Sequence, residues 1–170
     1  RNYLFESYLK VVQHYKPRVF VFENVPGILS AKPGDGSVRI IDLIQKAFAD
    51  AGYAVLPDLS NAIIDMTEYG VPQNRKRIII LGVSKEHYGD KAEAMVEKFY
   101  SSYLPEYKIE KKATVRDAIG DLPKLRPLDE PISYLGRKLS HSVSDPLING
   151  HISRFHNNRD IELFKFLEED

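Results

Sequence analysis

Hydrophobic residues recur with a helical period at two places in the first half of the chain. Over residues 2–16 they are spaced three and four positions apart, which predicts an amphipathic helix that ends before Pro17. A second pattern of this kind covers residues 38–51 and is followed by Gly52, a common residue just beyond a helix. We therefore predict two helices that each pack one apolar face against a sheet.

Two continuous apolar runs, at residues 19–22 and 77–83, predict strands buried on both faces, as in a parallel sheet between helices. Residues 53–65 are predicted to be extended, with an interruption near Pro57, and residues 30–37 to be a flexible loop. The order of these elements predicts an α/β fold. It corresponds to the second half of a doubly wound sheet that ends in an antiparallel pair, with the first half missing.

The second half of the chain has a different pattern. Residues 85–103 form a charged helical stretch with aromatic residues, and a short helix with a Thr N-cap is predicted at residues 114–119. Residues 123–150 are rich in Pro, Ser and Asp and show little periodicity, whereas residues 158–169 are again helical. We predict a boundary near residues 84–112, followed by an irregular second unit.

The composition excludes several classes of protein and site. Lys and Arg together number 24, as do Asp and Glu, so the net charge is zero with neutral His, and nucleic-acid binding would need a local basic patch. No apolar run approaches the roughly 18 residues of a membrane span. The chain has no cysteine, which excludes disulfides and thiolate metal sites, and its five His lack metal-ligand spacing, so no metal site is predicted.

Polar residues follow the first apolar run. Glu23 ends the predicted strand and precedes a Pro-Gly loop, and ligands of α/β folds bind at the carboxyl ends of strands. The position therefore suits a functional acid, although an isolated Glu there is more often a structural cap. Asn24 is expected to hydrogen-bond amides of the loop.

Basic residues precede the second apolar run. In extended chain, residues two apart point to the same face, so Arg75 and Arg77 are expected to share a side, beside Gln73. Guanidinium groups suit carbonyl oxygens, carboxylates and phosphates. The alternative for a basic triplet is a solvated loop before a strand.

Taken together, these two segments resemble two blocks of the DNA (cytosine-5)-methyltransferases. They are Phe22-Glu23-Asn24-Val25-Pro26-Gly27 and Tyr69-Gly70-Val71-Pro72-Gln73-Asn74-Arg75-Lys76-Arg77. A third match is Arg1-Asn2-Tyr3-Leu4-Phe5, which is similar to a family block without its leading Asp. Residues 114–119, with His151 and Arg154, are similar to the region that enters the family's target recognition domain.

The resemblance implies a reaction and roles for particular residues. In this family a cysteine thiolate attacks carbon 6 of a flipped-out cytosine, and carbon 5 takes a methyl group from S-adenosyl-L-methionine. Glu23 would protonate or hydrogen-bond ring nitrogen 3 and bind the amino group. Arg77 would bind the exocyclic oxygen, so that both stabilise charge that grows in the transition state. Arg75 and Gln73 would support them, either by organising the loop or by approaching the base and the DNA backbone.

Further expectations follow from the same resemblance. Leu4 matches a leucine that packs against the adenine of the cofactor, and Asn24 and Val25 would shape the loop around the base. The implied partners are S-adenosyl-L-methionine and double-stranded DNA. The implied setting is a restriction-modification system in a bacterial cytoplasm.

Because the chain lacks the cysteine, we interpret it as the middle of a methyltransferase that is inactive alone. Residues 1–84 would be the C-terminal half of the catalytic domain, a Rossmann-like S-adenosyl-methionine-dependent sheet. Residues 85–112 would be a charged helical connector, and residues 113–170 the start of a partial, irregular target-recognition region. The exposed sheet edge predicts self-association.

Three alternatives remain open. The chain could be one subunit of a split methyltransferase, or a catalytically dead homologue that only binds DNA. It could also be a relative that methylates tRNA, although that branch usually departs from Pro72-Gln73.

Overall fold

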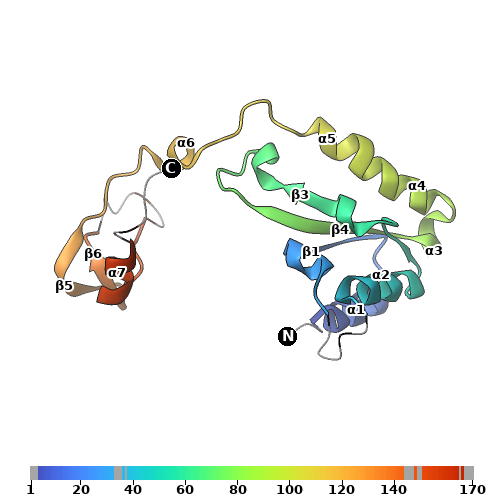
Figure 1. Ribbon diagram of the computed structural model, residues 1–170, viewed down its shortest axis with the longest axis horizontal. Helices are drawn as coiled ribbons and strands as arrows, with labels where there is room; N and C mark the ends of the chain where they lie inside the picture. The colour runs from blue at the N-terminus through green and yellow to red at the C-terminus, as the bar shows by residue number, and fades with distance from the viewer. Residues whose placement is uncertain are drawn as a thin grey trace. The chain divides into compact units, whose positions relative to one another are not determined.

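The computed structural model describes residues 4–32, 36, 38–143, 148, 151–164 and 166. The fold is α/β, as predicted. The chain divides into two compact units, Arg1–Ala118 and Ile119–Asp170, which are described separately (Figure 1).

A four-stranded antiparallel sheet forms the centre of the first unit. Its central strand is β4 (Lys76–Ser84), and β1 (Val19–Asn24) pairs along one edge. On the other edge, β2 (Tyr53–Ala54) pairs with the end of β4 and β3 (Ile63–Asp65) with its start. Since β1 and β2 are each antiparallel to β4, they run in the same direction.

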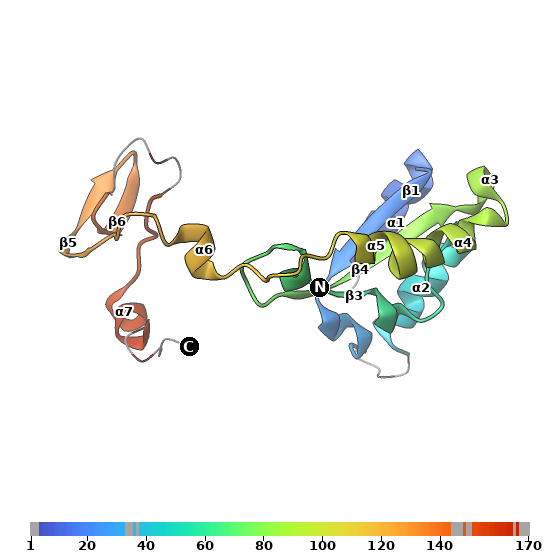
Figure 2. The ribbon, with the colours of Figure 1, turned by 90° about the horizontal axis from the view of Figure 1, so that it is seen from above.

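Helices cover both faces of this sheet (Figures 1 and 2). On one side lie α1 (Leu4–Tyr15) and α2 (Ile40–Asp50). The other side carries α3 (Lys85–Tyr88), α4 (Lys91–Lys98), the π-helical turn η4 (Phe99–Tyr103) and α5 (Leu104–Glu106). Three 3-10 turns connect the strands: η1 (Pro26–Leu29), η2 (Leu59–Ala62) and η3 (Met66–Tyr69).

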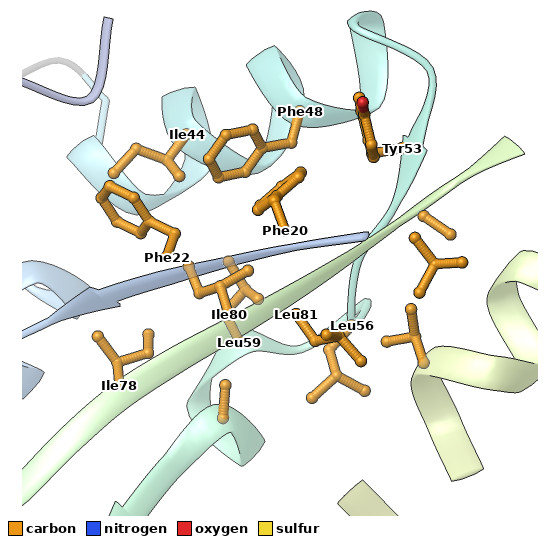
Figure 3. Packing of buried hydrophobic residues seen from close by; sticks show 14 of the residues in the cluster. Phe20, Phe22, Ile44, Phe48, Tyr53, Leu56, Leu59, Ile78, Ile80 and Leu81 are labelled. Atoms are coloured by element: carbon orange, nitrogen blue, oxygen red, sulfur yellow. The ribbon is translucent and has the colours of Figure 1, made fainter. Parts of the chain in front are cut away.

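The core on the α1–α2 side is built from aromatic rings (Figure 3). Phe48 of α2 is fully buried, and its ring centroid lies 4.5 Å from that of Phe20 and 5.8 Å from that of Phe22. Phe20 lies directly opposite Gly82 on β4, where a side chain would collide with its ring. Gly82 is therefore required by close packing and not by its backbone angles.

The prediction that residues 19–22 are buried on both faces is wrong. Phe20 and Phe22 are buried, whereas Val19 and Val21 are 42% and 54% exposed. The predicted parallel pairing is also absent from the described strands, since every strand pair is antiparallel. The reason is that β1 is an edge strand, and α4, on the second face, packs on β4 and β2 instead.

The charged stretch at residues 85–103 is helical, as predicted, but it is not a free connector. Ala92 and Val96 of α4 are buried in the core of the first unit. The structural boundary therefore falls between Ala118 and Ile119 and not within residues 84–112.

A short helix, α6 (Val115–Ile119), ends the first unit and runs one residue into the second. Its predicted N-cap is confirmed, because Asp117 N donates to Thr114 Oγ1 over 3.1 Å. Asp117 Oδ2 in return accepts from Thr114 N over 2.8 Å, which completes a reciprocal capping arrangement.

The second unit contains a hairpin that the sequence did not predict. It consists of β5 (Pro127–Tyr134) and β6 (Arg137–His141), joined by a turn in which Leu135 and Gly136 both have positive φ. A third element, α7 (Asn158–Phe164), confirms the start of the last predicted helix. The rest of that prediction falls largely on residues 165 and 167–169, which lie outside the described residues.

Part of the predicted loop at residues 30–37 also lies outside the described residues, namely 33–35 and 37. In the part of the chain that the structure describes, no helix has the length and apolarity needed to cross a membrane.

Candidate functional site

Glu23 and Arg77 form an ion pair at one end of the sheet. Arg77 Nε lies 2.8 Å from Glu23 Oε1. The strand register produces this contact: Glu23 lies opposite Ile79 of β4, and Arg77 is two positions before Ile79. Both side chains therefore stand on the same face at diagonal positions, within reach of each other.

The two partners differ in their burial. The Arg77 side chain is 18% exposed, whereas that of Glu23 is 49% exposed. Arg77 is held a second time, because its Nη1 donates to the backbone oxygen of Lys76 over 2.7 Å. A guanidinium has five N–H donors, so these contacts leave donors available, as well as the second oxygen of Glu23. The pair can thus present an acceptor and several donors side by side to a planar polar ligand.

Strand β1 ends at Asn24, directly after Glu23, and the turn η1 begins at Pro26. Asn24 Oδ1 accepts a hydrogen bond from Val25 N over 2.8 Å, which confirms the predicted role of Asn24 in the loop. Pro26 then begins η1, where its missing N–H is not needed and its fixed φ suits the first turn.

A cavity of about 460 Å³ opens beside the end of β1. It brings together four residues predicted for the site, because Leu4, Glu23, Asn24 and Val25 all line it. The remaining wall is mainly apolar and comprises Phe5, Phe22, Gly27, Ile28, Ala31, Ile40 and Ile44. A mainly apolar cavity with a few polar groups in its wall has the size and character of a site for a heterocyclic ligand.

The basic loop contributes to a different part of the surface. Arg75 precedes β4, its side chain is exposed, and its backbone oxygen accepts from Met66 N over 2.9 Å. Gln73 is also exposed. Neither residue lines the cavity, and neither does Arg77.

The turn η3, which leads into this loop, is held by contacts that the sequence analysis missed. Asp65 caps it by accepting hydrogen bonds from the N–H and the hydroxyl of Thr67, which together hold the pKa of the Asp65 carboxyl below its ordinary value. Glu68 binds the segment after α5, since Ile109 N donates to its backbone oxygen over 2.8 Å. Its carboxylate pairs with Lys108 Nζ at 2.6 Å, which raises the pKa of Lys108. The cap by Asp65 could have been predicted from neighbouring residues. The contacts of Glu68 with Lys108 and Ile109 could not, because these residues are far apart in the sequence.

In the second unit, Ser140 connects β6 to the residues before α7. Its Oγ donates to the backbone oxygen of Arg154 over 3.2 Å and accepts from His156 N over 3.2 Å. His151 Nε2 lies 2.7 Å from the backbone oxygen of Pro123. Among the described residues, no group of three or more His, Asp or Glu could hold a metal ion.

Comparisons with known proteins give a consistent result. A profile of the family described as C-5 cytosine-specific DNA methylase matches residues 1–159. The Type II methyltransferase M.Bpa9945I of Bacillus paralicheniformis is 41% identical over 133 residues, which cover 75% of this chain and 27% of that protein. The Type II methyltransferase M.MthTI of Methanothermobacter thermautotrophicus is 37% identical over 139 residues, 82% of this chain and 36% of that protein.

A solved structure is also similar. It belongs to an Escherichia coli prophage protein described as a DNA modification methyltransferase, with a TM-score of 0.54 at 25% identity. The match covers 78% of this chain and 33% of that one. The chain therefore spans only about a quarter to a third of the length of these three proteins.

Proposed function

Because the chain belongs to the C-5 cytosine-specific DNA methylase family, we propose that it supplies the base-binding residues of an enzyme that methylates carbon 5 of cytosine in DNA. The observation that carries this proposal is the ion pair of Glu23 and Arg77, with 2.8 Å between Oε1 and Nε. The pair places an acidic and a guanidinium group where one planar base could contact both.

The edge of cytosine is complementary to this pair. Ring nitrogen 3 and the amino group face a carboxyl group, and the adjacent exocyclic oxygen faces a guanidinium. When a thiolate attacks carbon 6, negative charge moves toward nitrogen 3 and the exocyclic oxygen. Glu23 would hold a proton at nitrogen 3, and Arg77 would hydrogen-bond the oxygen, so both contacts strengthen as the charge develops. The chain contains no cysteine, so in this proposal the thiolate comes from outside these 170 residues.

The cavity beside β1 is proposed to take part of S-adenosyl-L-methionine. That cofactor supplies an electrophilic methyl group when bound. The apolar wall that includes Leu4, Phe5 and Ile40 fits a flat heterocycle such as adenine, and it would exclude water from it. Asn24 and Val25, which also line the cavity, would shape the loop next to the base.

Double-stranded DNA is the proposed substrate, with the target cytosine rotated out of the stack, because its carbon 5 and carbon 6 cannot be reached inside a duplex. Arg75 and Gln73 are exposed on the loop before β4, where they would contact the base or the backbone. Since the relatives are Type II methyltransferases, we also propose a role in restriction-modification. The proposed setting is a bacterial cytoplasm, since M.Bpa9945I comes from a Bacillus.

The sheet is proposed to be the second half of a Rossmann-like methyltransferase sheet. In support, β1 and β2 run in the same direction with β4 inserted between them in the opposite direction, and helices cover both faces. Residues 119–170 would begin the target-recognition region.

The test is transfer of labelled methyl groups from S-adenosyl-L-methionine to DNA by the methyltransferase that contains this chain. Glu23→Gln and Arg77→Ala should each lower kcat by about 100-fold or more, as loss of one charge-stabilising donor does in other enzymes. The matched control is Lys46→Ala, which removes an exposed ion pair with Asp50 on α2 and should leave the rate unchanged. Full activity in both site variants would refute the assigned roles, and an inactive parent protein that still binds DNA would favour a DNA-binding homologue.

A further inference from the structure

One edge of β4 has a gap in its strand pairing. On this edge, β3 pairs with residues 76–78 and β2 with residues 83–84. In the described chain no strand pairs with residues 79–82 on this side, because the chain between β2 and β3 leaves the sheet through η2 (Leu59–Ala62). The backbone groups of β4 in this gap need other partners.

The hydroxyl of Tyr100 fills the gap. It donates to the backbone oxygen of Ile79 over 2.6 Å and accepts from Leu81 N over 2.8 Å. Ile79 and Leu81 are two positions apart, so their backbone groups point to the same edge. A single hydroxyl, which is both a donor and an acceptor, thus replaces the missing strand.

Tyr100 comes from the π-helical turn η4, a type of turn that is rare and is often found at functional sites. Its ring packs against Phe99 with centroids 4.9 Å apart, and burial raises the pKa of its hydroxyl. A phenol with its ordinary pKa of about 10 is already protonated at neutral pH, as donation to Ile79 requires, and burial moves the pKa further in the same direction.

The gap lies next to the candidate site. Ile79 is the residue opposite Glu23 on β1, and it follows Arg77 by two positions on β4. The backbone position of Ile79 therefore determines how Arg77 and Glu23 are placed relative to each other. Among the described residues, Tyr100 is the only one whose hydroxyl binds the backbone oxygen of Ile79.

We propose that Tyr100 is a positioning residue, which holds β4 at Ile79 so that Arg77 and Glu23 can contact the same base. This inference rests on the proposed function, because it assigns Tyr100 a role in the reaction only through Arg77. It goes beyond that function by naming a residue that lies outside the family-like segments at residues 22–27 and 69–77.

The chain provides a matched control in Tyr53. Its hydroxyl also makes one hydrogen bond to a backbone oxygen, that of Pro17 over 2.8 Å, and its ring is buried in the same core. Tyr53 lies opposite Ser84, at the end of β4 farthest from Arg77. Tyr53→Phe therefore also removes a hydroxyl that donates to a backbone oxygen, and it leaves the backbone at Ile79 unchanged. Tyr100→Phe removes a second hydrogen bond as well, so the two variants are compared at matched thermal midpoints.

The experiment compares the parent methyltransferase with Tyr100→Phe, Tyr53→Phe and Arg77→Ala. Tyr100→Phe should lower kcat by about tenfold or more while KM for S-adenosyl-L-methionine stays unchanged, since small misplacements of a reacting group have effects of this size. Amide hydrogen exchange over residues 76–84 should become faster in this variant. Tyr53→Phe should keep kcat within about twofold of the parent, even where its thermal midpoint falls equally.

Equal values of kcat in the two Tyr variants, at matched thermal midpoints, would overturn the positioning role. An inactive Arg77→Ala combined with a fully active Tyr100→Phe would overturn this inference alone. Full activity of Arg77→Ala would overturn the proposed function and this inference with it.

Discussion

Arg77 Nε lies 2.8 Å from Glu23 Oε1, although the two residues are far apart in the sequence and lie on different strands. Because the Glu23 side chain is 49% exposed, such a pair adds only about 0–1 kcal/mol to stability. The ion pair therefore contributes little to the stability of the fold. Its more important role is preorganisation, because the opposite charges are already in place before a polar ligand binds.

The planar shape of the Arg77 side chain should matter as well as its charge. Its Nε binds the carboxylate of Glu23 while Nη1 binds the backbone oxygen of Lys76, so one guanidinium group makes two contacts in different directions. Lys has a single ammonium group and cannot reproduce both contacts. We expect Arg77→Lys to lower kcat for methyl transfer by about 100-fold, close to the effect of Arg77→Ala. A Lys variant with near-parental kcat would show that charge alone is sufficient.

Gly82 should be intolerant of any side chain. A Cβ atom at this position would lie 2.2 Å from Cε1 and Cζ of Phe20, whose ring is fixed between Phe48 and Tyr53. Overpacking of this kind costs about 1–3 kcal/mol, so Gly82→Ala should lower the free energy of unfolding by that amount. Urea denaturation followed by circular dichroism measures it.

The control for Gly82→Ala is Gly27→Ala. Gly27 has open space where a Cβ would stand, and its φ is not positive, so this change should have a much smaller effect. Equal losses of stability in the two variants would contradict the packing explanation.

The elements predicted correctly are those with local signals. The periodicity of α1 and α2 and the capping Thr114 of α6 depend on residues that are close in sequence. The sequence predicted a parallel sheet with an antiparallel pair only at its end. It did not show that every pair is antiparallel, because this depends on β4 inserting between two strands that run the other way. The hairpin of β5 and β6 was not predicted, because β5 contains two Pro and exposed acidic residues. These residues interrupt the alternation of apolar and polar positions that identifies a strand.

The candidate site was predicted in part. The resemblance to a known family selected Glu23 and Arg77, and the strand register that joins them became visible only in the structure. The cavity groups Leu4 with Glu23, which sequence spacing alone does not imply. The role of Tyr100 was not predicted, because nothing in the local sequence shows that its hydroxyl binds two backbone groups of β4.

The cap of η3 predicts a pH dependence. Hydrogen bonds from Thr67 lower the pKa of Asp65 in the folded chain. A carboxyl with a lowered pKa stabilises the fold above its ordinary pKa of about 4, and this stabilisation is lost as the pH falls through the lowered value. We therefore expect Asp65→Asn to reduce the thermal midpoint at pH 7 and to have little effect near pH 2.

The comparison for Asp65→Asn is Asp90→Asn. Asp90 is the N-cap of α4 but makes no side-chain hydrogen bond there, so its replacement should not change the pH profile. Thermal midpoints of both variants across this range of pH measure the difference. A constant offset for Asp65→Asn at every pH would rule out the carboxylate as the cause.

The outer face of β1 predicts self-association of this chain. Val19 and Val21 expose apolar surface, and β1 is an edge strand that can pair with another copy. The edge is only partly covered, since Tyr8 donates its hydroxyl to the backbone oxygen of Val21 over 2.9 Å. Val21→Lys should therefore shift the chain toward monomer, whereas Val115→Lys, at an equally exposed position on α6, should not. Light scattering after size-exclusion chromatography at several concentrations measures the mass, and an unmodified chain that stays monomeric throughout would show that this edge does not associate.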